Sequence, residues 1–250
     1  MLSDKEAGIK KYPLFLQKYY FSAKEDREGK IKNFYSDVQA NSIILEGACG
    51  KVSIMRDSNP NIKILIGVDL SKDSIKLNDK LDFKIVSDLE NLPFKKDYFD
   101  IVNLVNVIEH LKNPEKVFRE ANYVLKKGGV LLISTKNIYN PFMASNKFLP
   151  FNIRYLIKKK FLKITGHYLD TFPAPYRCNS PRRMNKVLVN CGFKIVNIWL
   201  WGWPLIGTNM IGLFFSMLYE KLTDRRCLQL FKPNIWVKVK KVKDNICFPG

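Results

Sequence analysis

The stretch SIILEGACGKV, residues 42–52, joins a short apolar run to small residues that follow it directly. Ser42–Leu45 is rich in isoleucine, short and bounded by polar residues, which predicts a buried strand. Small residues after a strand let the backbone turn tightly and approach a ligand. The stretch therefore predicts the first strand-to-helix turn of an α/β sheet.

Further apolar runs follow at the spacing of an alternating fold. They are rich in isoleucine and valine and are separated by amphipathic segments, which is typical of βαβ units around a buried parallel sheet. Asn113-Pro114 predicts the start of a helix that continues through Leu125 and ends at Lys126–Gly129. A second helix is expected over Pro181–Asn190, ended by Gly192. The expected strands are 42–45, 63–69, 83–87, 99–105, 130–135, 194–199 and 235–241.

Two acidic residues stand at the ends of expected strands. Asp69 lies about 20 residues past the glycine turn, where a carboxylate can accept hydrogen bonds from ribose hydroxyls. A second interpretation stays open, because Ser71 and Asp73 share its turn and Asp69 could simply cap the next helix. Asp88 follows the third strand, and its alternative is a solvated loop acid.

The stretch LPFKKDYFDIVNLVNVIEHL, residues 92–111, supplies the longest motif. In register with the turn at 46–52, with Asp69, with Asp88 and with Ser134–Asn137, it resembles the class I S-adenosylmethionine-dependent methyltransferases. The likeness is to the broad group that contains quinone and small-molecule methyltransferases, and it covers residues 40–137. It implies a Rossmann-like α/β fold: a mostly parallel seven-stranded sheet with helices on both faces, an insertion after strand five and a helical insertion between the last two strands.

The resemblance also implies S-adenosyl-L-methionine as the cofactor. Asp69 matches the acid that binds the ribose, with Leu70 beside the adenine, and Asp88 matches the acid near the adenine amino group. The implied cofactor-binding residues are Glu46, Gly47, Ala48, Gly50, Asp69, Leu70, Asp88, Leu89 and Asn106.

The turn departs from the family pattern, acid-x-Gly-x-Gly-x-Gly. Ala48 and Val52 stand where the first and third glycines of that triplet are usual, and only Gly50 remains. Because a β-branched residue tolerates positive φ poorly, Val52 predicts a displaced or weakly bound methionine end of the cofactor. A cofactor-impaired homologue is therefore an open alternative.

Asn106-x-x-Glu109-His110 is the candidate catalytic segment. Some quinone O-methyltransferases carry Glu-x-x-Glu-His here together with a divalent metal, but the first glutamate is Asn106 in this chain. The two remaining candidate ligands, Glu109 and His110, are too few for a typical metal site, so no metal is predicted. His110 is expected to act as general base toward a hydroxyl, or alternatively to orient the loop above the cofactor.

The segment GHYLDTFPAPYR, residues 166–177, combines ionisable and aromatic side chains in an irregular insertion. Loops at the carboxyl ends of such a sheet normally build the acceptor site. We expect His167, Asp170, Tyr176 and Arg177 to contact the acceptor. The alternative is a packed aromatic loop in which Asp170 and Arg177 pair with each other.

The chain length of 250 residues, 46% of them hydrophobic, suits one methyltransferase domain with decorations. The expected parts are a helical lead-in over 1–40, a cofactor-binding core over 41–137, an acceptor-side insertion over 138–190, and final strands with an apolar helical insertion over 191–250.

The charge is strongly basic, with 42 Lys and Arg against 23 Asp and Glu, or +19. This predicts attraction to an anionic partner such as nucleic acid, acidic lipid or a phosphorylated substrate, although a basic surface without a partner is the alternative. The five cysteines are odd in number and widely spaced, and there are only two histidines. These features argue against a disulfide framework or zinc site and favour a reducing, cytoplasmic compartment.

The stretch Ile195–Tyr219 carries no charge. Part of it is an expected strand, and the rest is too short and too broken by Gly and Pro to favour a spanning helix. Three tryptophans stand at its start, and Ile206, Met210, Leu213, Phe214 and Met217 share one helical face. We expect this helix to lie on an anionic membrane, which would place the protein peripherally on the inner face; a core or dimer-packing helix is the alternative.

These observations together predict methyl transfer from S-adenosylmethionine to a small or lipid-linked acceptor, at oxygen. Two other functions stay open. A glycine turn followed by an acid also serves NAD-dependent oxidoreductases, and the altered turn together with the charge would suit a silent module that binds membranes or, less favoured, nucleic acid.

Overall fold

The structure of the chain, a computed structural model, divides into two compact units. We call residues 34–137, 174–199 and 234–250 the sheet unit, and residues 1–33, 138–173 and 200–233 the helical unit. The helical unit thus gathers the N-terminal lead-in, most of the first insertion and the apolar insertion before the last strand, while the single decorated domain stays a prediction. The residues that the structure describes are 11–53, 55–59, 61–141, 143–144, 153, 174–202 and 210–244.

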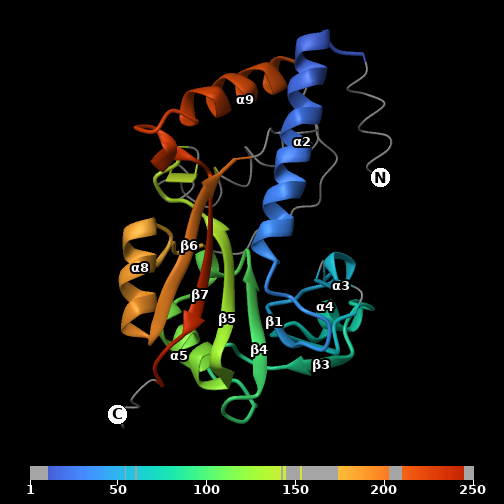
Figure 1. Cartoon of the computed structure of the whole chain (residues 1–250), viewed down its shortest axis with the longest axis vertical. Helices are drawn as coiled ribbons and strands as arrows, with labels where there is room; N and C mark the ends of the chain where they lie inside the picture. The colour runs from blue at the N-terminus through green and yellow to red at the C-terminus, as the bar shows by residue number, and fades with distance from the viewer. Residues whose placement is uncertain are drawn as a thin grey trace. The chain divides into compact units, whose positions relative to one another are not determined.

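All seven predicted strands form, and they make one sheet in the order β3-β2-β1-β4-β5-β7-β6 (Figure 1). β1 to β5 pair in parallel, and β7 is antiparallel to β5. This confirms the mostly parallel Rossmann-like sheet. The strands are β1 (Ile43–Gly47), β2 (Ile64–Asp69), β3 (Phe83–Val86), β4 (Phe99–Val105), β5 (Leu125–Lys136), β6 (Phe193–Trp201) and β7 (Asn234–Lys241).

The strand order reverses between β1 and β4, which are neighbours in the sheet although β2 and β3 separate them in the chain. The parallel register places Gly47 beside Val68 of β2 on one side and Leu104 of β4 on the other. In open α/β sheets, ligands bind outside the carboxyl ends of the strands at such a point. The topology therefore places the turn after β1 where a ligand is expected.

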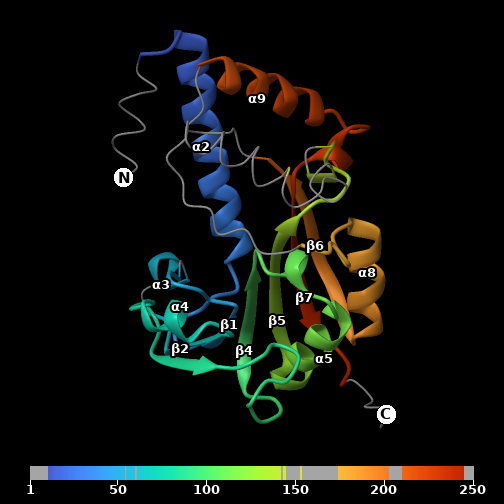
Figure 2. The ribbon, with the colours of Figure 1, turned by 180° about the vertical axis from the view of Figure 1, so that it is seen from behind.

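Short helices surround the sheet. Figures 1 and 2 show α3 (Met55–Ser58) and α4 (Lys72–Lys76) at the β3 end of the sheet, and α5 (Pro114–Val124) and α8 (Pro181–Asn190) at the β6 end. A 3₁₀ turn, η1 (Ile108–His110), follows β4. The two long predicted helices are thereby confirmed.

The end of α5 differs from the expectation. Lys126–Gly129 was expected to close the helix, but β5 already begins at Leu125. The ladder with β4 then jumps from the pair Phe99–Leu125 to the pair Ile101–Val130, and Gly128 takes a φ of 77° in the bulge between them. The basic and glycine residues thus form an irregularity in a strand, since a bulge needs the same left-handed glycine as a helix end.

The helical unit is built on α2 (Leu14–Phe34) and α9 (Met210–Thr223), which account for the predicted lead-in and apolar insertion. The two helices share a small core of Leu16, Tyr20, Leu213 and Met217. None of the helices in the described part of the chain combines the length and apolar character needed to cross a membrane.

The face of α9 expected to meet a membrane is wrong in part. Leu213 and Met217 are buried against α2, whereas Met210 and Phe214 of the same expected face are exposed. Ile206 lies outside the described residues. The reason is that α9 carries apolar side chains around most of its circumference, so its sequence alone does not select the face that packs.

Candidate active site

The turn after β1 is left-handed at two positions. Ala48 has a φ of 51° and Gly50 a φ of 55°. The N–H of Cys49 donates to the carbonyl oxygen of Val68 at 3.2 Å, and the Asn78 amide donates to the carbonyl oxygens of Cys49 and Gly50, both at 3.3 Å. Backbone atoms of the turn thus bind the backbone of β2 and the side chain of Asn78, just past α4, which fixes the path of the turn.

The expected positive φ at Val52 is wrong, while a displaced or weakly bound methionine end of the cofactor stays a prediction. Val52 is not among the residues with positive φ, and its side chain is 70% exposed. The left-handed positions fall at 48 and 50, so the chain asks for no special conformation at 52 and the valine does not strain the turn. The strained position in the altered glycine pattern is therefore Ala48, which has a Cβ and a positive φ.

Asp69 joins this turn to the start of α4. Its Oδ2 accepts the N–H of Gly50 at 2.8 Å, and its Oδ1 accepts the N–H of Ser71 at 2.8 Å. The side chain that caps α4 is that of Ser71, which accepts the N–H of Ser74 at 3.2 Å. Asp69 is thus not the helix cap, and its carboxylate is held at the edge of the sheet, with Leu70 beside it 71% exposed.

Gly47 lies in close contact with two leucine side chains. A Cβ at this position would lie 2.6 Å from Cδ2 of Leu104 and 2.9 Å from Cδ2 of Leu89. Leu89 is buried, while its neighbour Asp88 is exposed and accepts the N–H of Glu90 at 2.9 Å. Leu89 therefore packs beneath the end of β1, and Asp88 presents its carboxylate at the surface after β3.

Glu46, the last side chain before the turn, is buried. Oε1 accepts the amide of Asn103 from β4 at 3.4 Å, and Oε2 is enclosed without a hydrogen bond from any described residue. Burial raises the pKa of Glu46 to about 7, although the hydrogen bond from Asn103 opposes this. Burial, and then the nearby Glu46 charge, raise the pKa of Tyr35 as well. A buried carboxylate oxygen with no donor is a ready acceptor for a bound cationic group.

Asn103 was not predicted as a site residue. It lies inside the run Ile101–Val105 and is fully buried. The only sequence signal is a polar residue in an otherwise apolar strand, and such a residue needs a buried partner.

Asn106 and Glu109 lie at the carboxyl end of β4. Asn106 is exposed with a φ of 53°, and its N–H donates to the carbonyl oxygen of Ser134 at 2.7 Å. Glu109 is buried and accepts the Thr135 hydroxyl at 2.7 Å, while the Asn179 amide donates to the same hydroxyl oxygen at 2.7 Å. This buried chain of hydrogen bonds links η1, the end of β5 and the segment before α8.

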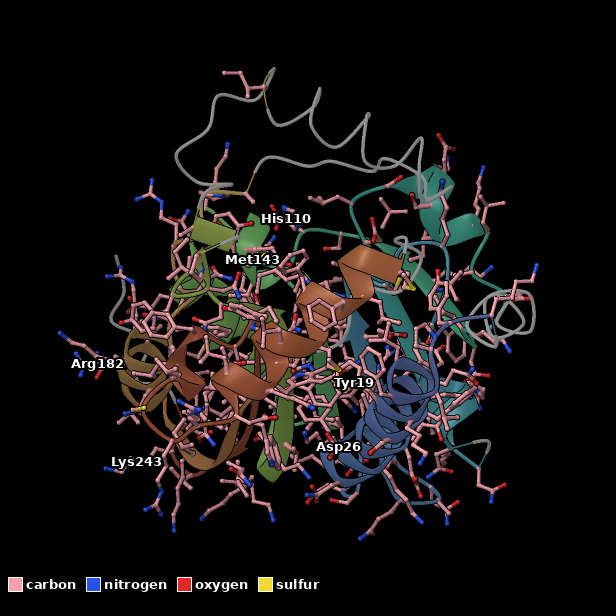
Figure 3. The ribbon with its side chains drawn as sticks, turned by 90° about the horizontal axis from the view of Figure 1, so that it is seen from above. Tyr19, Asp26, His110, Met143, Arg182 and Lys243 are labelled. Carbon is pink, nitrogen blue, oxygen red and sulfur yellow. The ribbon has the colours of Figure 1, made fainter. Side chains whose placement is uncertain are left out.

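Two of the four predicted acceptor residues fall in that segment. The N–H of Tyr176 donates to the carbonyl oxygen of Glu109 at 3.2 Å, and Arg177 is exposed next to it. The adjacent residue of η1 is His110, which is partly exposed and is labelled in Figure 3. The structure thus places Tyr176 next in space to Glu109, close to the proposed base. His167 and Asp170 lie outside the described residues, as does a pairing between Asp170 and Arg177.

Within the described residues, no group of three or more His, Cys, Asp and Glu side chains is placed to hold a metal ion. Cys49, beside the turn, is protonated at ordinary pH because burial, and then the charge of Asp69, raise the pKa of its thiol to about 12. It fills space under the turn.

Comparison with known proteins shows which proteins the part of the chain around this site is similar to. Residues 45–133 match the family model described as a methyltransferase domain. An uncharacterized protein of Methanocaldococcus jannaschii is 45% identical over 74 residues, which cover 29% of this chain and 35% of that protein. A tRNA (carboxymethyluridine(34)-5-O)-methyltransferase of Arabidopsis thaliana is 31% identical over 109 residues, which cover 42% of this chain and 26% of that protein.

A third relative and a solved structure agree with these matches. The ubiquinone biosynthesis O-methyltransferase of Pelagibacter ubique is 29% identical over 119 residues, 44% of this chain and 47% of its own. The chain thus spans from about a quarter to about half of the length of these three relatives. The crystal structure of a SAM-dependent methyltransferase from Archaeoglobus fulgidus superposes with a TM-score of 0.54 at 17% identity, covering 87% of this chain and 94% of that one. The resemblance and the fold predicted from the sequence are confirmed, and S-adenosylmethionine is indicated as the cofactor.

Replacement Ala48→Gly is expected to stabilise the protein by up to about 1 kcal/mol, because relief of roughly 1–2 kcal/mol of left-handed strain outweighs a cost of about 0.4–1 kcal/mol from the freer unfolded chain. Urea unfolding measures the change. Val52→Gly is the matched control: it relieves no strain and should destabilise by about 1 kcal/mol through the freer unfolded chain. Equal effects of the two replacements would contradict the assignment of the strained position.

Replacement Thr135→Val is expected to lower the free energy of unfolding by about 1–3 kcal/mol, because it leaves the buried Glu109 carboxylate without its donor. Thr135→Ser keeps the hydroxyl and should cost about 1 kcal/mol or less. Urea unfolding of both variants at neutral pH gives the comparison. A valine variant as stable as the serine variant would show that the hydrogen bond carries no stability.

The raised pKa of Glu46 predicts a dependence of stability on pH. The folded protein binds this proton more tightly than the unfolded chain, so stability falls as the pH rises from about 4.5 to about 7 and stays low above it. Glu46→Gln removes this loss, and its advantage over wild type should grow by about 1–3 kcal/mol between pH 5 and pH 8. Urea unfolding without cofactor at both pH values tests this; a similar growth in the surface control Asp73→Asn would sink the assignment.

Proposed function

We propose that this chain, which carries a class I methyltransferase domain at residues 45–133, transfers a methyl group from S-adenosylmethionine to a small or lipid-linked acceptor, at an oxygen atom. The observation that supports this best is the pair of carboxylates around one turn. Glu46 presents a buried oxygen without a donor, and Asp69 is held against the N–H of Gly50. Glu46 lies near the end of β1, the strand at which the strand order reverses, and Asp69 ends its neighbour β2.

The residues of the turn fit this cofactor. Glu46 would accept the ammonium group of the methionine portion, and Asp69 would accept the ribose hydroxyls. Asp88 and the exposed Leu70 would face the adenine, while Gly47 and Leu89 keep the floor of the turn close-packed. Ala48, Gly50 and Asn106 would line the same edge with left-handed backbone.

Little further chemistry is asked of the protein. The bound cofactor supplies an activated methyl group on a positively charged sulfur. The chain must align the acceptor, exclude water and take up the acceptor's proton. His110 is the proposed base, since it lies beside Glu109, whose carbonyl oxygen holds the acceptor segment through Tyr176.

Transfer to oxygen is supported by a base suited to a hydroxyl and by two relatives whose names specify O-methylation. A ubiquinone/menaquinone C-methyltransferase of Neisseria meningitidis is also similar, at 24% identity over 113 residues. Tyr176 and Arg177, together with His167 and Asp170, are the proposed acceptor contacts. Arg177 suits an anionic part of the acceptor because it is exposed and cationic.

A role on nucleic acid is the second candidate, supported by the net charge of +19 and by the similarity to a tRNA methyltransferase. The alternative of a catalytically silent binding module was based partly on strain at Val52, and Val52 does not strain the turn. The oxidoreductase alternative is set aside because the family match and the named relatives are methyltransferases. A cytoplasmic location is proposed from the cysteines; Cys49, Cys178, Cys191 and Cys227 are all unpaired thiols.

Replacement Asp69→Asn is expected to weaken binding of S-adenosylhomocysteine by about 1–3 kcal/mol, or roughly 5- to 150-fold, because the ligand hydroxyls lose a charged acceptor. Titration calorimetry measures the affinity. Asp73→Asn, on the exposed side of α4, is the matched control and should bind as wild type does. Unchanged affinity in the Asp69 variant would remove that residue from the site. Stabilisation of the wild type by NADH and not by adenosylhomocysteine, in a thermal-shift assay, would overturn the proposed cofactor.

A further inference from the structure

The helix α9 has a second apolar face, opposite the one that packs on α2. Leu213 and Met217 are buried in the small core of the helical unit. Phe215 is 61% exposed, Leu218 52% and Leu222 45%. Buried and exposed apolar residues thus alternate around the helix, and the exposed ones follow the spacing of a single stripe.

The start of α2 extends this stripe. Leu14 and Phe15 are exposed at 65% and 52%, and the ring of Phe15 meets that of Phe214 edge to face, with centroids 6.4 Å apart. Phe214 in turn meets Phe215 at 5.9 Å. Figures 1 and 2 show one end of α9 beside the N-terminal part of α2 in both views. We call these exposed side chains the aromatic ridge: Leu14, Phe15, Phe214, Phe215, Leu218 and Leu222.

Cationic side chains stand beside the aromatic ridge. Lys11 and Lys18 flank its α2 part, and Lys221, Arg225 and Arg226 lie at its other end; all five are exposed. The acids at that end are engaged, since Glu220 and Asp224 bind Lys232 at 3.1 and 2.6 Å. The ridge is therefore apolar in its middle and positive at both ends.

We infer that the aromatic ridge docks on the surface of an anionic lipid bilayer. Exposed apolar area of this extent is unusual on a monomeric surface, and aromatic rings favour the interface between lipid headgroups and acyl chains. Lysine and arginine at both ends match the negative lipid headgroups, whereas a second copy of this chain would bring like charges together. The ridge would lie in the interfacial layer with the two helices parallel to the membrane plane.

This docking deepens the proposed function and rests on it only for the acceptor. A lipid-linked acceptor is confined to the membrane, so an enzyme that binds the same surface meets it at a high local concentration. The physical case for the ridge depends on exposure and charge alone. Binding to lipid and binding of the cofactor can therefore be measured separately and can fail separately.

Sedimentation with vesicles tests the inference, using full-length protein and vesicles of phosphatidylcholine alone or mixed with phosphatidylglycerol. Wild type is expected to bind the mixed vesicles only, with partial weakening by salt. The triple variant Phe214→Ser, Phe215→Ser, Leu218→Ser should lose binding by about tenfold or more. Lys221→Glu with Arg225→Glu should also weaken it and remove most of the salt dependence. The matched control Leu77→Ser with Val189→Ser alters exposed apolar residues of the sheet unit and should bind as wild type does.

Three outcomes overturn the inference: wild type that ignores anionic vesicles, a triple variant that binds them equally, or a wild-type dimer by light scattering that the triple variant turns into a monomer. The last would make the ridge an interface between copies. Circular dichroism checks that each variant is folded, and Leu222→Ser with Leu14→Ser repeats the test from the ends of the ridge if the triple variant is not. Calorimetry with adenosylhomocysteine should give the same affinity for every variant as for wild type. If wild type does not bind adenosylhomocysteine, that result counts against the proposed function and not against docking on lipid.

Discussion

The site depends on the hydrogen bonds that the carboxylate of Asp69 accepts from two backbone turns. This carboxylate accepts one backbone N–H from the turn after β1 and another from the turn after β2, both at 2.8 Å. Hydrogen bonds to a charged acceptor are roughly twice as strong as neutral ones. A single side chain thus joins the turn at the point where the strand order reverses to the turn after the neighbouring strand β2, and the left-handed residues Ala48 and Gly50 lie in the first of these turns. The same carboxylate is left facing the edge where a ligand would lie.

The sequence predicts the sheet well because its signals are local. The central strands β1, β2 and β4 are apolar runs that are buried along most of their length, so their limits coincide with the burial. The conformation at Val52 was harder to predict, because φ at a given position depends on where the turn is anchored and not on the residue pattern. Asn103 was not predicted as a site residue because its partner Glu46 comes from another strand, and only the order of the strands in the sheet brings the two together.

The helical unit shows the opposite limit. The sequence of α9 indicates a helix but not its inner face, because apolar residues occupy both sides. The choice is made by Leu16 and Tyr20 of α2, which come from the other end of the chain. Once Leu213 and Met217 are taken into that core, the remaining aromatic residues are left outside. A helix that is apolar all round needs two partners, and packing in the described structure supplies one.

The cofactor side and the acceptor side are built on different principles. Around the turn, the geometry is set by strand register and by backbone hydrogen bonds, which are insensitive to most side-chain changes. On the acceptor side, the chain before α8 is held by the Glu109 carbonyl and by the hydroxyl of Thr135, which accepts Asn179 while donating to the Glu109 carboxylate. This network fixes the start of the segment before α8 but leaves the exposed side chain of Arg177 outside the core. Exposed side chains of this segment can therefore vary without disturbing the fold, as is usual for loops that a rigid sheet positions.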